Sequence, residues 1–143
     1  LEQAVEIYDN LFERDECIFI ITPFRTVAES MRSFVNDYFR NKGYDRDCLI
    51  SWTKKCIGTV HTFQGKGANE VLFVLGCSKM SVGAMNWVVK KANILNVAVT
   101  RAKYRIGFIG DMQDWKKLKY FREFIPYLID EIQVDDSSCL FTS

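Results

Sequence analysis

The chain has 143 residues, a length that fits one domain with a real hydrophobic core. Hydrophobic residues make up 48% of the sequence, aromatic residues 14% and charged residues 26%, and this profile excludes intrinsic disorder. The formal net charge of +1 excludes a wholly basic surface for nucleic acid. Any phosphate contact must therefore come from a local cluster or from backbone N–H groups.

The five cysteines are odd in number and show no C-x-x-C spacing, which argues against a disulfide framework or a zinc knuckle. Because His61 is the single histidine, we also predict no histidine-based metal site and no bound metal. Free thiols favour a reducing intracellular compartment, the cytoplasm or alternatively the nucleus. The N-terminus does not resemble a signal peptide, no apolar run has the length of a membrane span, and the start at Leu1 suggests a trimmed fragment.

The hydrophobic pattern alternates between strand-like and helix-like segments. In chain order we expect a helix at 2–13, a strand at 17–21, a helix at 25–41, short strands at 49–50 and 57–60, a Gly-rich loop at 65–67, a strand at 71–75, a helix at 85–102, a strand at 105–109 and one or two helices to about residue 132. This alternation predicts an α/β fold in three layers, with a mostly parallel sheet flanked by helices. Residues 1–134 are expected to form a single domain, followed by a frayed tail at 135–143.

Ligands of open parallel sheets bind beyond the carboxyl ends of the strands. That rule points to four segments, at 22–25, 61–67, 76–78 and 110–111. The chain has no G-x-x-x-x-G-K-[ST] motif, so it lacks a P-loop of its own. The G-K-G at 65–67 starts like a dinucleotide fingerprint, but Glu70 stands where the third glycine belongs, and no G-x-S-x-G elbow of a serine hydrolase is present.

Three stretches carry groups suited to phosphate chemistry. The first, T-V-H-T-F-Q-G-K-G-A-N-E-V at 59–71, gathers hydroxyl, imidazole, amide and ammonium groups where it joins two predicted strands. The alternative interpretation is a polar loop with a satisfied core histidine. In the second, N-I-L-N-V-A-V-T-R-A-K at 93–103, Arg101 ends a predicted helix. Its planar guanidinium there suits a transferred phosphoryl group or, alternatively, the helix dipole.

The third stretch, I-F-I-I-T-P-F-R at 18–25, places the hydroxyl of Thr22 and the cation of Arg25 at the ligand edge of the sheet. The alternative interpretation is a strand that stops at Pro23 and is followed by the start of a helix. An arginine at a helix start opposes the helix dipole slightly, which favours a functional reason for Arg25.

Together and in this order, the three stretches resemble the second motor domain of superfamily 1 DNA/RNA helicases. They are most similar to the branch that includes the 5′-to-3′ helicases of nonsense-mediated decay and DNA replication. Residues 59–65 resemble helicase motif V, and residues 96–103 resemble motif VI, N-V-A-[LV]-T-R-A-[KR]. The segment at 20–25 is similar to the family's I-T-P-[YF]-[RE], and F-I-G-D at 108–111 to the strand after motif VI. The resemblance covers most of the chain and implies a RecA-like domain of the P-loop NTPase type.

The resemblance also implies roles for individual residues. Arg101 becomes an arginine finger that reaches the γ-phosphate of ATP, which is bound with Mg²⁺ by the first RecA-like domain of the same polypeptide. Gln64, Gly65 and Lys66 then line the nucleotide. The backbone of single-stranded DNA or RNA is expected to meet Thr22, Pro23, Arg25, Thr59, His61 and Thr62. Because the Walker A and B motifs belong to the first domain, this chain alone is expected to bind no cofactor and to hydrolyse no ATP.

One position departs from the family pattern. Motif V usually reads Q-G-x-E, and Gly67 stands where the acid belongs. Either Glu70 takes over as a nucleotide-binding residue, or the coupling to the nucleotide is weakened. Weak coupling favours the alternative function, a non-catalytic nucleic-acid or protein-interaction domain derived from a helicase fold. A receiver-like signalling domain would need an acidic cluster where Thr22 and Pro23 stand. The sequence does not indicate whether the nucleic acid is DNA or RNA, or which polarity the movement has. It also does not indicate whether the enzyme unwinds or only translocates, which domains are fused to it, or its oligomeric state.

Overall fold

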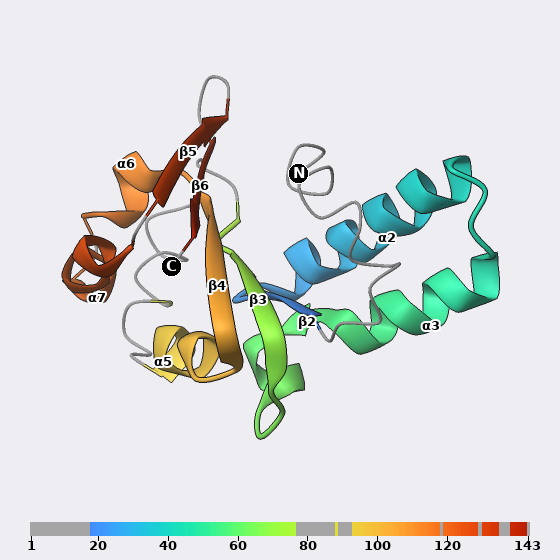
Figure 1. Cartoon of the computed structure of the whole chain (residues 1–143), viewed down its shortest axis with the longest axis horizontal. Coiled ribbons are helices and arrows are strands. Elements are labelled where there is room, and N and C mark those ends of the chain that lie inside the picture. The colour runs from blue at the N-terminus through green and yellow to red at the C-terminus, as the bar shows by residue number, and fades with distance from the viewer. Residues whose placement is uncertain are drawn as a thin grey trace.

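A six-stranded mixed sheet forms the centre of the computed structural model, which describes residues 18–76, 88, 93–117, 119–128, 130–134 and 138–142 (Figure 1). Four strands run parallel to one another: β1 (Ile18–Thr22), β2 (Ile57–Thr59), β3 (Ala68–Val74) and β4 (Ala102–Gly110). Two antiparallel strands extend the sheet beyond β4: β5 (Asp130–Val134) and β6 (Ser138–Thr142). The order across the sheet is β2-β1-β3-β4-β6-β5.

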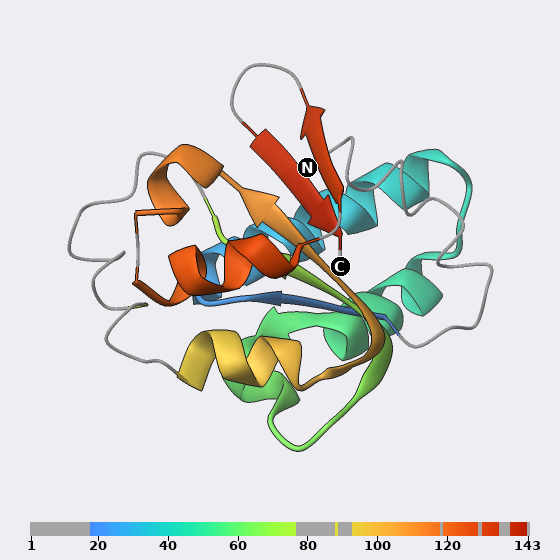
Figure 2. The ribbon, with the colours of Figure 1, turned by 60° about the vertical axis from the view of Figure 1, so that its left-hand side comes forward.

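Helices cover both faces of the sheet, as Figures 1 and 2 show. One face carries α2 (Arg25–Asn41) and α3 (Arg46–Cys56), and the other carries α5 (Asn93–Val99), α6 (Met112–Trp115) and α7 (Lys119–Phe124). Short 3-10 helices, η1 (Val60–Phe63) and η2 (Ile125–Tyr127), complete the order. None of the helices in the described segments has the length and hydrophobicity needed to cross a bilayer.

Two hydrophobic clusters, one on each face, hold the three layers together. Alternate residues of a strand point to opposite faces, and β3 shows this clearly. Leu72 packs with the cluster under α2 and α3, whereas Val71 and Phe73 pack with the cluster that contains α5, α6 and α7. Every residue of β1 is buried, as expected for a strand covered on both sides. The predicted three-layer α/β fold with its parallel sheet is therefore confirmed.

The predicted elements agree best with the structure where the apolar pattern in the sequence is long. The helix expected at 25–41 is α2, with the bounds that were predicted, and its buried stripe includes Met31 and Val35. The strands expected at 17–21, 57–60, 71–75 and 105–109 are present with shifted ends. The helix expected at 2–13 lies outside the described residues, and only part of the one expected at 85–102 lies inside them.

The strand expected near residues 49–50 is wrong, because Leu49 and Ile50 lie in α3. Leu49, Thr53 and Cys56 are the buried residues of this helix, and their spacing of four and three residues is helical. Asp45 caps the helix, since its carboxylate accepts a hydrogen bond of 2.9 Å from the N–H of Cys48. A capping aspartate and a stripe that begins at Leu49 were signals for a helix that the apolar pair at 49–50 concealed.

Two expectations about the C-terminal part are also corrected. Ile132 lies in strand β5 rather than in a helix, and Ser138–Thr142 forms strand β6 where a frayed tail was expected. Phe108 of β4 is in register with Phe141 of β6. Without β6, the carboxyl half of β4 would have unpaired backbone groups at the edge of the sheet. The periodicity of a short segment does not reveal such long-range pairing. The assignment of residues 1–134 to one domain stays a prediction.

The cap at Asp45 gives stability that depends on pH. The hydrogen bond from the backbone of Cys48 lowers the pKa of the Asp45 carboxyl below its ordinary value of 3.8. The ionised cap therefore contributes fully at neutral pH, and its contribution is lost as the pH falls through this lowered folded-state pKa. We expect Asp45→Ala to lower the midpoint of thermal unfolding at pH 7 and to make little difference at pH 2. Asp45→Asn, which caps without titrating, should lose less stability at pH 7. An equal loss for Asp45→Ala at both pH values would contradict this account.

Candidate functional site

Three hydrogen bonds hold the guanidinium of Arg101, which lies between α5 and β4. Its Nε donates to the carbonyl of Val97 at 3.2 Å, and its Nη2 donates to the Oγ1 of Thr100 at 3.1 Å. Its Nη1 donates to the carbonyl of Lys66 at 3.0 Å, which joins two stretches that lie 35 positions apart. The backbone repeats this connection, because the N–H of Ala68 donates to the carbonyl of Arg101 at 2.9 Å.

The loop before β3 meets Arg101 through its backbone and leaves its long side chains exposed. Gly65 has a φ of +81°, in the left-handed region that favours glycine, and the N–H of Lys66 donates to the carbonyl of Phe63 at 3.0 Å. The side chains of Gln64 and Lys66 are exposed. We call Arg101 together with Gln64, Gly65 and Lys66 the Arg101 cluster. A guanidinium has five N–H donors, so two of those of Arg101 remain after its three bonds.

The Arg101 cluster lies at the amino ends of β3 and β4, which corrects the expectation that the whole 61–67 stretch lies at carboxyl ends. The turn of η1 directs the chain back along the sheet. A Cβ on Gly58 would lie 3.0 Å from the side chain of Thr62, and the ring of Phe63 stacks on that of Phe19 with centroids 4.2 Å apart. Figure 1 shows α5 and the loop before β3 together at the end where β3 and β4 begin.

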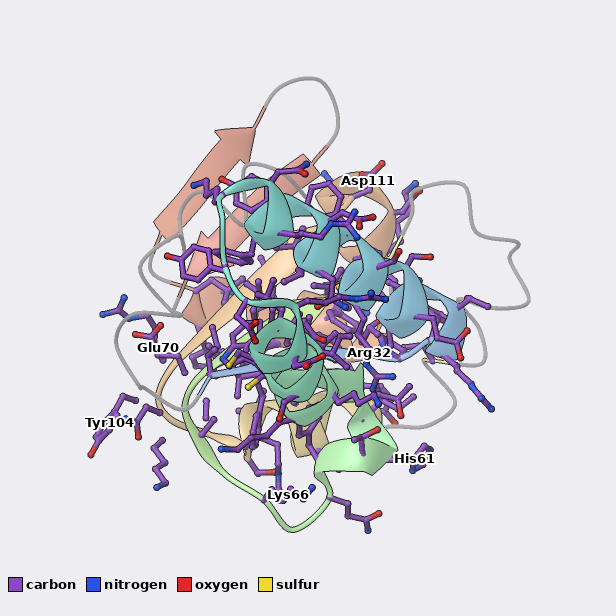
Figure 3. All side chains as sticks on the ribbon, turned by 90° about the vertical axis from the view of Figure 1, so that its right-hand side faces the viewer. Arg32, His61, Lys66, Glu70, Tyr104 and Asp111 are labelled. Atoms are coloured by element: carbon purple, nitrogen blue, oxygen red, sulfur yellow. The ribbon has the colours of Figure 1, made fainter. Side chains whose placement is uncertain are left out.

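The first part of the same stretch remains at the carboxyl end of β2. Thr59 begins a capping box in which its N–H donates to the Oγ1 of Thr62 at 3.3 Å, and the two hydroxyl oxygens lie 3.2 Å apart. His61 is exposed, so the alternative of a satisfied core histidine is wrong. Thr62 is exposed as well. Figure 3 shows His61 and Lys66 at separate places on the surface.

The segment after β1 presents only part of its predicted contact residues to solvent. Thr22 and Thr59 are in register at the carboxyl ends of neighbouring strands. Thr22 is fully buried, and its hydroxyl accepts a hydrogen bond of 3.4 Å from the N–H of Phe24, while Pro23 is also buried. Arg25 is 87% exposed and forms an ion pair of 2.9 Å with Glu29, an arrangement that contributes little to stability. In this segment, Arg25 is the predicted contact residue that a ligand can reach.

The structure does not bring Glu70 to the Arg101 cluster. Glu70 precedes Val71 in β3, so its side chain lies on the face that α2 and α3 cover. There it forms an ion pair of 3.6 Å with Arg105 of β4 and is only 16% exposed. Helix α5, which leads to Arg101, packs on the opposite face. Figure 3 likewise shows Glu70 and Lys66 well apart, so Glu70 does not occupy the place of the acid that Gly67 lacks.

Arg32 is a residue of the site region that sequence reasoning missed. From α2, its Nε and Nη2 both donate to the carbonyl of Ile57, at 2.9 and 2.7 Å. These bonds fix β2, a strand of three residues at the edge of the sheet that ends at Thr59. The signal in the sequence was slight: a cation next to Met31, at the border of the buried stripe of α2.

Comparison with known proteins gives two results. The family described as AAA domain matches residues 1–113 of the chain. The chain is also 29% identical over 152 residues to Helicase SEN1 of Saccharomyces cerevisiae (strain ATCC 204508 / S288c), an alignment that covers 96% of this chain and 6% of that protein. The chain therefore spans a small part of the relative that it matches, and the similarity is to a helicase-type domain.

Proposed function

The chain belongs to the AAA domain family, and from that premise we propose that it is the second motor domain of an ATP-dependent superfamily 1 DNA/RNA helicase. One observation carries the proposal: the hydrogen bond from Arg101 to the carbonyl of Lys66 joins the stretches that resemble motifs VI and V. The similarity to Helicase SEN1 supports the helicase class. We assign the chain to the branch of 5′-to-3′ helicases by the same motifs.

In this proposal, Arg101 stabilises charge on the γ-phosphoryl group of ATP. The phosphate cradle belongs to the first motor domain, because this chain has no P-loop. Charge spreads over the phosphoryl oxygens in the transition state, and a cation that is already held in place stabilises it without reorganisation. The bonds to Val97, Thr100 and Lys66 supply that rigidity, and the two remaining N–H groups supply the contact.

Mg²⁺ belongs with the first domain in this scheme. The Arg101 cluster is cationic, and among the described residues no group of three or more His, Cys, Asp or Glu side chains could hold a metal ion. The residues of this chain that face the nucleotide are Arg101, Gln64, Gly65 and Lys66, and none of them offers a carboxylate. When bound by the first domain, Mg²⁺ neutralises phosphate charge.

The nucleic-acid track then lies at the opposite end of the parallel strands. Arg25, Thr59, His61 and Thr62 are the reachable predicted residues there, and hydroxyl and cationic groups suit phosphates without reading sequence. The segment from Thr59 to Lys66 runs from this end of the sheet to the Arg101 cluster. A change at the nucleotide therefore has a short covalent path to the strand of nucleic acid.

This function is tested by measuring ATP hydrolysis by the full-length protein with and without single-stranded DNA and RNA. We expect hydrolysis that at least one of the two polymers stimulates. No hydrolysis with either polymer would contradict the proposal. It would favour the alternative, a non-catalytic nucleic-acid or protein-interaction domain. The observation that favours this alternative is Gly67. Motif V usually has an acidic residue at this position, and Glu70 does not take its place.

A further inference from the structure

The outer edge of β2 carries backbone groups that bond to helices instead of to a strand. Ile57 begins β2, which is the last strand on its side of the described sheet. The N–H of Ile57 donates to the carbonyl of Thr53 at the end of α3, and its carbonyl accepts both bonds from Arg32 of α2. Both backbone groups of Ile57 are therefore turned away from β1, toward the open edge where unpaired groups need partners.

The capping box at the end of β2 lies along the same edge. Residues two apart in a strand turn their backbone groups to the same side, so Thr59 repeats the orientation of Ile57. Its N–H donates to the Oγ1 of Thr62 at 3.3 Å. Ile57 and Thr59 are about 7 Å apart along the strand. The guanidinium of Arg32 and the hydroxyl of Thr62 are thus bound to neighbouring points on one open edge.

The hydrogen bonds of Arg32 leave part of its guanidinium without a partner. Its Nε and Nη2 donate to the same carbonyl, so three of the five N–H donors remain: two on Nη1 and one on Nη2. Among the residues that the structure describes, Arg32 has no ion-pair partner and no further hydrogen bond. Nη1 and Nη2 together form a fork that binds a phosphate through two parallel bonds.

We propose that Arg32 is a phosphate contact of the nucleic-acid track, an inference that rests on the proposed function. The carbonyl of Ile57 holds the guanidinium in place, and the open fork receives the anion. The ligand is the backbone of a single strand, which such a contact binds without reading its sequence. Arg32 extends the track from Thr59 and Thr62 back along the outer edge of β2.

Helix α2 places a second arginine of the track on the same face as Arg32. Arg25 and Arg32 are seven residues apart, a spacing that returns to one face of a helix after about 10 Å along its axis. Glu29 lies between them and is paired with Arg25 at 2.9 Å. The carboxylate of Glu29 therefore serves Arg25, and the charge of Arg32 stays available to an anion.

The position of Arg32 favours nucleic acid over the nucleotide. Figure 3 shows Arg32 and His61 toward one side of the molecule and Glu70, near the amino end of β3, toward the other. The Arg101 cluster belongs to the amino ends of β3 and β4, whereas Arg32 is bonded to the strand that ends in the capping box. The competing role is structural, because the same two hydrogen bonds attach β2 to α2.

The test measures the Kd of the full-length protein for a single-stranded oligonucleotide over a range of salt concentrations, without ATP. In Arg32→Gln the amide Nε2 takes the place of Nε, so the bond to Ile57 is kept while the charge and the fork are lost. We expect this variant to raise the Kd on the order of tenfold. The slope of log affinity against log salt should become shallower by about 0.7, the value for one phosphate of a single strand. Arg32→Lys keeps the charge and should keep the slope.

Arg40→Gln is the matched control. Arg40 is also an exposed arginine of α2, but it is paired with Asp37 at 2.8 Å and lies eight residues further from the start of the helix. Its replacement should change neither the Kd nor the slope. In Arg32→Gln the midpoint of thermal unfolding and the kcat of ATP hydrolysis at saturating nucleic acid should stay close to those of the parent protein.

Three results would overturn the inference. An unchanged Kd in Arg32→Gln would exclude the contact. A higher Kd with an unchanged slope would leave Arg32 only the role of attaching β2 to α2. An equal effect of Arg40→Gln would reduce the finding to the general charge of the helix. Because the binding measurement needs no ATP, each of these results leaves hydrolysis and its dependence on Arg101 to be decided separately, so the proposed function would stand.

Discussion

Replacement of Arg101 by alanine in the full-length protein is expected to lower the kcat of nucleic-acid-stimulated ATP hydrolysis on the order of 10³- to 10⁵-fold. The guanidinium is held by three hydrogen bonds at the amino end of β4 and keeps two N–H donors for a phosphoryl group. Removing it leaves the developing charge without its cation. Phosphate release at saturating ATP and saturating single-stranded nucleic acid is the measurement.

Arg101 also holds the carbonyl of Lys66, so a loss of fold has to be separated from a loss of chemistry. The midpoint of thermal unfolding and the affinity for single-stranded nucleic acid should therefore be measured on the same variant, and both should change little. Arg122→Ala removes an exposed arginine from α7 and is the matched control, with near-normal kcat. If Arg101→Ala keeps near-normal hydrolysis, the role of an arginine finger is refuted.

Replacement of Phe63 by alanine is expected to destabilise the chain by about 3–5 kcal/mol. The ring is fully buried at the end of η1 and stacks on Phe19, with centroids 4.2 Å apart and planes inclined by 28°. The change would create a cavity under the loop that carries Gln64 and Lys66. Because folded domains have roughly 5–15 kcal/mol of stability in total, much of the population would unfold at moderate urea concentrations.

Urea unfolding of the 143-residue chain, followed by fluorescence, gives the free energy directly. Phe63→Leu fills most of the cavity and should lose less stability. Tyr104→Ala also removes an aromatic ring, but from an exposed position, so its free energy of unfolding should stay within about 0.5 kcal/mol of the parent chain. A similar loss in Phe63→Ala and Tyr104→Ala would show that the stack on Phe19 does not anchor the loop.

The fold class could be predicted because the parallel strands are buried on both faces. A run such as the one ending at Thr22 is recognisable from its apolar, β-branched residues alone. The long helix α2 could be predicted because its buried stripe repeats over 17 residues. Helix α3 could not be, because Leu49 and Ile50 taken alone resemble a strand, and only the more distant Thr53 and Cys56 reveal the helical period. The hairpin of β5 and β6 depends on pairing with β4, which is a long-range requirement.

The sequence groups Arg101 and the loop at 64–67 in one candidate site, but the edge of the sheet that it predicted for the loop is wrong. The approach of Arg101 to the loop at 64–67 is present as a hydrogen bond to Lys66. The rule that ligands lie beyond carboxyl strand ends predicted the wrong edge for these residues, because a 3-10 turn carries the chain back along β1 before β3 begins. The burial of Thr22 depends on the register of neighbouring strands, as does the placement of Glu70 on the face that α2 and α3 cover. This register could not be predicted from the sequence.

The pairing of β6 with Gly107–Gly110 has a practical consequence for any shortened version of this chain. A version that stops at Val134 would lack β6 and would leave backbone N–H and C=O groups of β4 unpaired at the edge of the sheet. An unpaired strand edge can pair with a strand of another molecule, which produces a domain-swapped dimer or an aggregate. Recombinant versions designed for the measurements above should therefore extend at least through Thr142.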